Sequence, residues 1–71
     1  MKYLVVIEET ASGFGAYVPD LPGCIAVGST RAEVTRLIHE AVQLHLESLA
    51  GDGLPIPMPH SSPDVVEVGD H

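Results

Sequence analysis

The chain has few of the features that usually stabilise a short protein. Its 71 residues include one cysteine, Cys24, so no disulfide can form within the chain. No CxxC or HxxxH pattern offers a structural zinc site. A chain this short buries only about 60% of its unfolded surface. Without a disulfide or a structural metal, it usually self-associates. We therefore expect one small domain over residues 1–71 that forms a homo-oligomer, a dimer or larger.

Basic residues are also scarce. The sequence has three Lys and Arg against ten Asp and Glu, a formal net charge of −7. Phosphate backbones and anionic membranes attract proteins chiefly through Lys and Arg. The composition therefore excludes direct binding to DNA, RNA or a membrane surface, and it favours a basic protein as the partner.

Long apolar runs are missing as well. The N-terminal apolar run, residues 3–7, has five residues and no cleavage-site pattern, and no stretch reaches 18 apolar residues. The sequence therefore predicts neither a signal peptide nor a transmembrane helix. We expect a cytoplasmic protein, in which a single unpaired thiol is ordinary.

The first 28 residues predict three antiparallel strands in series. Residues 3–8, 14–18 and 24–27 are rich in strand-forming side chains, and Gly28 ends the last run. The loop between the first two runs is predicted to be slightly longer than the tightest hairpin type. Residues 19–23 form the densest turn signal, in which Pro22 fixes φ and Gly23 can supply a positive φ.

A helix is predicted to follow. Thr30 can cap it, and Glu33 stands three residues later, which is capping-box spacing. No Gly or Pro interrupts the segment before Gly51, which we expect to end the helix. Residues at 100° intervals define an apolar face that comprises Val34, Leu37, Ile38, Ala41, His45, Ser48 and Leu49.

Two side chains, one in the predicted helix and one in the third predicted strand, could carry chemistry. His45 lies near the middle of the apolar face, while His39 and His60 are predicted off that face or in a loop. We therefore interpret His45 as a half-buried structural imidazole hydrogen-bonded to backbone or a carboxylate, not as a metal ligand. Cys24 has no neighbouring base in sequence, so we interpret it as a small buried apolar residue and not as a nucleophile.

The C-terminal third is predicted to be extended. Residues 53–63 contain three alternating prolines, which favours an extended crossover. Residues 64–68 alternate weakly and could form a last strand, and residues 69–71 are expected to fray. The predicted fold is α+β, with the order β-β-β-α-β. Both faces of the first strand are apolar and one helix covers only one face, so the other face or an edge is expected to meet a second copy.

Several segments resemble the signature of the HicB antitoxin family. The resemblance covers roughly residues 3–62 and is most specific over residues 17–23. It is carried by Val6-Ile7-Glu8-Glu9, Gly15-Ala16-Tyr17-Val18-Pro19-Asp20-Leu21-Pro22-Gly23-Cys24, Gly28-Ser29-Thr30, Glu40-Ala41, His45-Leu46-Glu47 and Gly53-Leu54-Pro55-Ile56-Pro57-Met58-Pro59.

The resemblance implies a truncated ribonuclease-H-like fold that neutralises a small, basic ribonuclease toxin of the HicA type by occluding it. Full-length family members usually add a C-terminal DNA-binding domain. Residues 1–71 show none, so operator binding is not expected of them. No cofactor is implied.

Ribonuclease-H chemistry needs several carboxylates around two Mg²⁺ ions, so the acidic residues are candidates for catalysis. Glu8 and Glu9 are predicted at a strand end, Asp20 in a turn, and Glu40 on the polar side of the helix, so we expect solvated carboxylates and no catalytic or metal site. A divalent-metal nuclease and a solitary oligomeric domain without a toxin remain alternatives. The expected partner surface comprises Glu8 and Glu9 with the corner from Tyr17 to Asp20.

Overall fold

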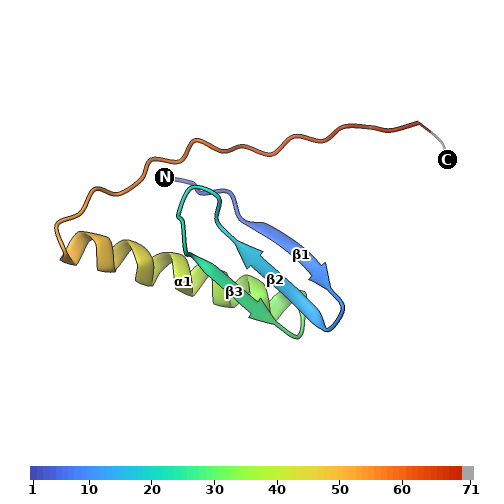
Figure 1. Cartoon of the computed structure of the whole chain (residues 1–71), viewed down its shortest axis with the longest axis horizontal. Helices are drawn as coiled ribbons and strands as arrows, with labels where there is room; N and C mark the ends of the chain where they lie inside the picture. Colours follow the sequence, from blue (N-terminus) through green and yellow to red (C-terminus); the bar gives the residue numbers. More distant parts are fainter. Residues whose placement is uncertain (70–71) are drawn as a thin grey trace.

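The computed structural model describes residues 1–69, which form a three-stranded sheet, one helix on a single face of it, and an extended C-terminal tail (Figure 1). The strands are β1 (Val6–Thr10), β2 (Gly13–Tyr17) and β3 (Ile25–Gly28), paired antiparallel in the order β1-β2-β3. The helix, α1, spans Arg31–Gly51. The predicted α+β meander with a following helix is confirmed.

The strand limits differ from the predicted ones because pairing sets them. Val6 pairs with Tyr17, the last residue of β2, so residues 3–5 have no strand partner within the described part of the chain and β1 begins at Val6. At the other end Thr10 pairs with Gly13, which leaves a two-residue loop. The prediction of a longer hairpin loop was wrong.

The corner between β2 and β3 is closed by its own backbone. Val18 N–H donates to the Cys24 carbonyl at 3.2 Å, and Cys24 N–H donates to the Leu21 carbonyl at 3.1 Å. Gly23 has φ 85°, in the left-handed region that side chains disfavour, while Pro22 is exposed. The corner thereby turns Leu21 into the core, where it is fully buried.

Capping residues define both ends of α1. The Thr30 hydroxyl accepts from Glu33 N–H at 3.0 Å, and Glu33 Oε1 accepts from Ser29 N–H at 2.7 Å, so the capping box is formed. At the other end Leu54 N–H donates to the Leu49 carbonyl at 2.9 Å and Gly53 has φ 68°. The helix ends at Gly51, as predicted, and a Schellman motif whose left-handed residue is Gly53 follows it.

The core lies between the helix and the sheet. It comprises Ala16, Val18, Leu21, Cys24, Val34 and Ile38. The helix packs chiefly against β3 and β2. Its buried face runs through Val34 and Ile38 and continues through the partly buried Val42 and Leu46, whereas Ser48 is exposed. The predicted apolar face is therefore right at its start and rotated towards Val42 and Leu46 further along.

The tail contains no strand between residues 54 and 69, so the predicted strand over residues 64–68 was wrong. A strand needs a neighbour, and the three-stranded sheet does not extend to this segment. Of the end predicted to fray, Gly69 is exposed and residues 70–71 lie outside the described residues. Within residues 1–69, no helix is long and apolar enough to cross a membrane.

Candidate functional site

The face of the sheet turned away from α1 is not covered by any helix or strand of residues 1–69. Side chains alternate along a strand, and Ala16 and Ala26 pack towards the helix, so their neighbours point the other way. Ile25 and Val27 are accordingly 69% and 76% exposed. We call this surface the outer sheet face; it comprises Val6, Glu8, Tyr17, Ile25 and Val27.

One end of the outer sheet face is acidic. Val6 pairs with Tyr17, and Glu8 lies two residues further along β1 on the same face, so Glu8 and Tyr17 are diagonal neighbours. Glu9 pairs with Phe14, which packs against the core, so Glu9 lies on the helix side of the sheet. Both glutamates are exposed. The structure thus brings Glu8 and Tyr17 onto one surface and leaves Glu9 at its rim.

Asp20, by contrast, is buried. Its side chain holds the tail: Oδ2 accepts from the backbone N–H groups of His60 and Ser61, each at 2.9 Å, and Oδ1 accepts from the Ser61 hydroxyl at 2.7 Å. The His60 Nε2 atom lies 3.1 Å from Oδ1. We call this arrangement the Asp20 clasp. Asp20 has 3% of its surface exposed and Tyr17 has 41%, so the structure does not bring these two residues of the predicted corner onto one surface.

The hydrogen bonds of the clasp stabilise the ionised carboxylate. They hold the pKa of Asp20 below its ordinary value of 3.8; the Ser61 hydroxyl has the largest effect, and desolvation by burial opposes it. No sequence pattern could find this contact, because Asp20 and Ser61 are 41 positions apart.

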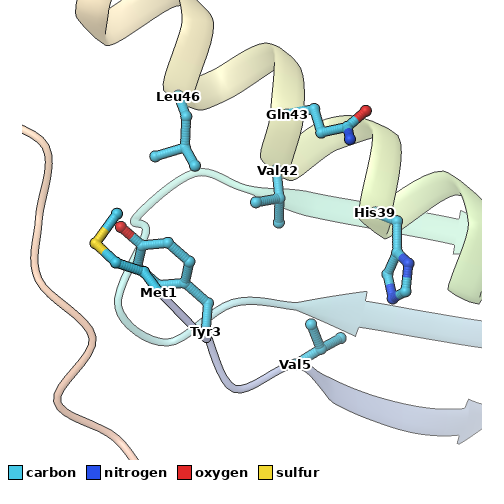
Figure 2. A pocket seen from close by; sticks show the side chains of 7 residues that line it. All are labelled: Met1, Tyr3, Val5, His39, Val42, Gln43 and Leu46. Atoms are coloured by element: carbon cyan, nitrogen blue, oxygen red, sulfur yellow. The ribbon is translucent and has the colours of Figure 1, made fainter.

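An apolar groove lies between the N-terminal segment and α1 (Figure 2). It has a volume of about 380 Å³. Val42 and Leu46 project from the helix towards Tyr3 and Val5. The remaining lining residues are Met1, His39 and Gln43. Sequence reasoning missed this groove, because its two walls lie more than 30 positions apart and only the fold brings them together.

The side chains considered for chemistry are separated. Cys24 is buried, as predicted, and burial raises the pKa of its thiol. His45 is half-buried on α1, and the side-chain hydrogen bonds found among residues 1–69 do not involve its ring. Glu40 pairs with Arg36 at 3.2 Å on the exposed side of α1. In the described part of the chain, no three His, Cys, Asp or Glu side chains gather in a way that could hold a metal ion.

Comparison with known proteins assigns the family. Residues 3–70 match the family described as the HicB-like antitoxin of bacterial toxin–antitoxin systems. The chain belongs to the HicB-like antitoxin family. The resemblance found in the sequence is thereby confirmed.

Relatives of this HicB-like chain occur in bacteria and phage. A UPF0150 protein of Helicobacter pylori is 43% identical over 49 residues, which are 69% of this chain and 68% of that protein. A 14.9 kDa protein from the rep-hol intergenic region of Haemophilus phage HP1 is 35% identical over 57 residues, which are 80% of this chain but 43% of the phage protein. The chain therefore spans less than half of that relative.

Two solved structures share the fold. A chain of the HicA3 and HicB3 toxin–antitoxin complex superposes with a TM-score of 0.72 at 38% identity, over 86% of this chain and 71% of that one. The antitoxin HicB3 crystal structure gives a TM-score of 0.68 at 38% identity, over 86% of this chain and 45% of that one. The HicB-like chain thus has the fold of proteins that are described as antitoxins.

Proposed function

We propose that this chain is an antitoxin that binds a small, basic ribonuclease toxin and blocks it by occlusion. The observation that carries the proposal is the match to a chain of the HicA3 and HicB3 toxin–antitoxin complex, at 38% identity over 86% of this chain. Family membership over residues 3–70 supports the same role. The toxin acts on RNA, so we expect the pair to work in the cytoplasm.

The charge of the chain suits such a partner. A ribonuclease needs a basic surface to hold its RNA, and this chain has a net charge of −7. Complementary charge speeds encounter and selects the partner more than it sets the final affinity. An acidic antitoxin domain would thus compete with RNA for the same basic surface of the toxin.

We place the toxin contact on the outer sheet face. Protein interfaces combine a desolvated apolar centre with a polar rim. Here exposed Ile25, Val27 and Tyr17 form the centre, while Glu8 and Glu9 stand at one rim. Asp20 is omitted from this surface, because its carboxylate is engaged by the tail.

We expect this function to require no catalysis by the antitoxin. Among the carboxylates considered for a nuclease, Asp20 is occupied by His60 and Ser61, and Glu40 is paired with Arg36. Two-metal nucleases need several free carboxylates that converge on one point. Turnover of an RNA–DNA hybrid by the purified chain in Mg²⁺ or Mn²⁺ would contradict the proposal.

Charge reversal on the acidic rim tests the mode of binding. The double variant Glu8→Lys/Glu9→Lys should slow association with a basic toxin of the HicA type by on the order of tenfold at low salt. A matched control, Glu47→Lys/Asp52→Lys, makes the same charge change at exposed positions in and just after the last turns of α1, away from the outer sheet face. We expect the association rate of this control variant to fall less than that of the Glu8→Lys/Glu9→Lys variant. Surface plasmon resonance across a tenfold range of ionic strength measures both effects, and equal rates at all salt concentrations would exclude electrostatic recognition.

The apolar centre is tested separately. Val27→Asp places a charge at a side chain that is 76% exposed, so the fold should tolerate it. Toxin affinity should fall at least about tenfold, because the charge would have to be desolvated in the interface. Unchanged affinity would place the toxin on another surface.

A further inference from the structure

We propose that residues 64–68 of one copy fill the apolar groove of a second copy, so that two chains exchange tails in a two-fold dimer. Two separate features carry this inference: an open apolar groove at one edge of the domain, and an exposed apolar segment in the tail that has no strand partner within residues 1–69.

The groove lies where a strand can be added. Residues 3–5 precede β1 at the edge of the sheet and have no strand partner among the described residues. Tyr3 and Val5 form one wall, and Val42 and Leu46 of α1 form the other, so the apolar space is open beside an unpaired stretch of backbone (Figure 2). An extended segment laid along residues 3–5 would pair with that backbone and cover the apolar walls.

The tail contains a segment of the matching kind. Val65, Val66 and Val68 are 90%, 82% and 68% exposed. Three β-branched residues within four positions favour a strand, and the segment is already extended. An exposed apolar run of this kind is typical of a surface that becomes covered by a partner.

The path of the tail favours the groove of a second copy, and not the groove of the same chain, as the binding site of residues 64–68. The Tyr3 hydroxyl donates to the Pro57 carbonyl, so the tail already passes its own groove at Pro57. The Asp20 clasp then fixes His60 and Ser61. Residues 65–68 follow Pro57 by eight to eleven positions, which in an extended chain is roughly 26–36 Å. Figure 1 shows the last part of the tail extending beyond the sheet, so residues 65–68 lie away from the packed domain of their own chain.

Charge also suits this pairing. Lys2 lies between Met1 and Tyr3, two residues that line the groove, and it is one of three basic residues in the chain. The incoming segment carries Asp64 and Glu67. Further along β1 the edge becomes acidic at Glu8 and Glu9, where Glu67 would be repelled. Attraction at Lys2 and repulsion at Glu8 therefore hold the segment at the end of the edge where the groove lies.

Cross-linking between two single variants tests which chain supplies the segment. Gln43→Cys labels the groove and Val66→Cys labels the tail; Cys24 is buried and serves as the common background. When the two variants carry tags of different mass and are mixed and oxidised, we expect a disulfide-linked heterodimer. Val27→Cys in place of Gln43→Cys is the matched control on the outer sheet face and should give at most a minor product. A linked monomer from the double variant Gln43→Cys/Val66→Cys would show that each chain fills its own groove and would overturn the proposal.

Sedimentation gives an independent readout. The full chain should be a dimer at micromolar concentration, and Val66→Asp/Val68→Asp should weaken the dimer by at least roughly a hundredfold, because two apolar side chains are replaced by charges. These positions lie outside the packed domain, so circular dichroism should be unchanged. Val27→Asp, the control, should remain dimeric. A monomeric wild-type chain, or a tail variant that dimerises like the wild type, would overturn the proposal. Loss of toxin binding in the tail variant without a change in sedimentation would assign the groove to the toxin instead.

Discussion

Ser61 donates both its backbone N–H and its hydroxyl to Asp20, one to each carboxylate oxygen, at 2.9 and 2.7 Å. This two-point contact joins the corner between β2 and β3 to the middle of the tail. A carboxylate that accepts several hydrogen bonds is stabilised in its ionised form. The tail is therefore held in place by a charge that the solvent can titrate.

Acid should release the tail. The pKa of Asp20 is lowered in the folded chain, so the clasp contributes its full stability above the ordinary value of 3.8 and loses it as pH falls through the lower, folded value. The amide signals of His60 and Ser61 should therefore shift together in an NMR titration below pH 4. Asp20→Asn should abolish this transition, whereas a transition that persists in the variant would assign it to another carboxylate.

The Ser61 hydroxyl should be the main determinant of that pKa. Ser61→Ala removes one hydrogen bond to the ionised carboxylate, so the pKa of Asp20 should rise towards its ordinary value. Amide exchange at residues 60 and 61 should accelerate roughly three- to tenfold. Ser62→Ala, at the exposed neighbouring serine, is the control and should change neither quantity. Equal effects of the two variants would contradict the observed clasp.

A side chain at position 28 should be costly. A Cβ on Gly28 would lie 2.9 Å from the Val34 backbone nitrogen, closer than folded proteins allow, so the start of α1 would have to move. We expect Gly28→Ala to destabilise the domain by about 1–3 kcal/mol in urea unfolding. Gly15→Ala, where a Cβ meets open space, should be neutral or slightly stabilising. A Gly28→Ala variant as stable as Gly15→Ala would show that β3 and α1 are not packed this closely.

Loss of the helix cap should be measurable. Thr30→Ala removes the hydroxyl that accepts from Glu33 N–H, which typically costs about 1 kcal/mol. Thr35→Ala removes a hydroxyl that donates to the Arg31 carbonyl within the helix, and the higher helix propensity of Ala should offset that loss. Thermal unfolding followed by circular dichroism should therefore separate the two variants. A lower midpoint for Thr35→Ala than for Thr30→Ala would contradict the capping interpretation.

Local features of the fold could be predicted from sequence because a few neighbouring residues determine them. The Thr30–Glu33 box and the positive φ of Gly23 depend on contacts within a few positions. The end of α1 at Gly51 is confirmed, but the sequence could not tell which glycine adopts the left-handed conformation after it; the bond from Leu54 N–H to the Leu49 carbonyl selects Gly53.

The candidate site was harder to predict because it depends on contacts between distant segments. Charge and family signature indicate Glu8 and Tyr17 as parts of one surface, but only the pairing of Val6 with Tyr17 shows that they lie on the same face of the sheet. Asp20 looked like a surface carboxylate because its partner Ser61 lies 41 positions away. The segment over residues 64–68 has a strand-like sequence, but the described sheet provides no neighbour for it.

The order in which the molecule assembles follows from the separation of its contacts. The meander pairs neighbouring segments and α1 follows directly, whereas Tyr3–Pro57 and Asp20–Ser61 close loops of 54 and 41 residues. Closing a longer loop costs more chain entropy, so the tail should dock last during folding and detach first in the native state. Hydrogen exchange should accordingly show residues 57–61 opening while β2 and α1 stay protected. In the proposed dimer these four hydrogen bonds stay within each chain, so two folded molecules could change partners through residues 64–68 without unfolding and without releasing them.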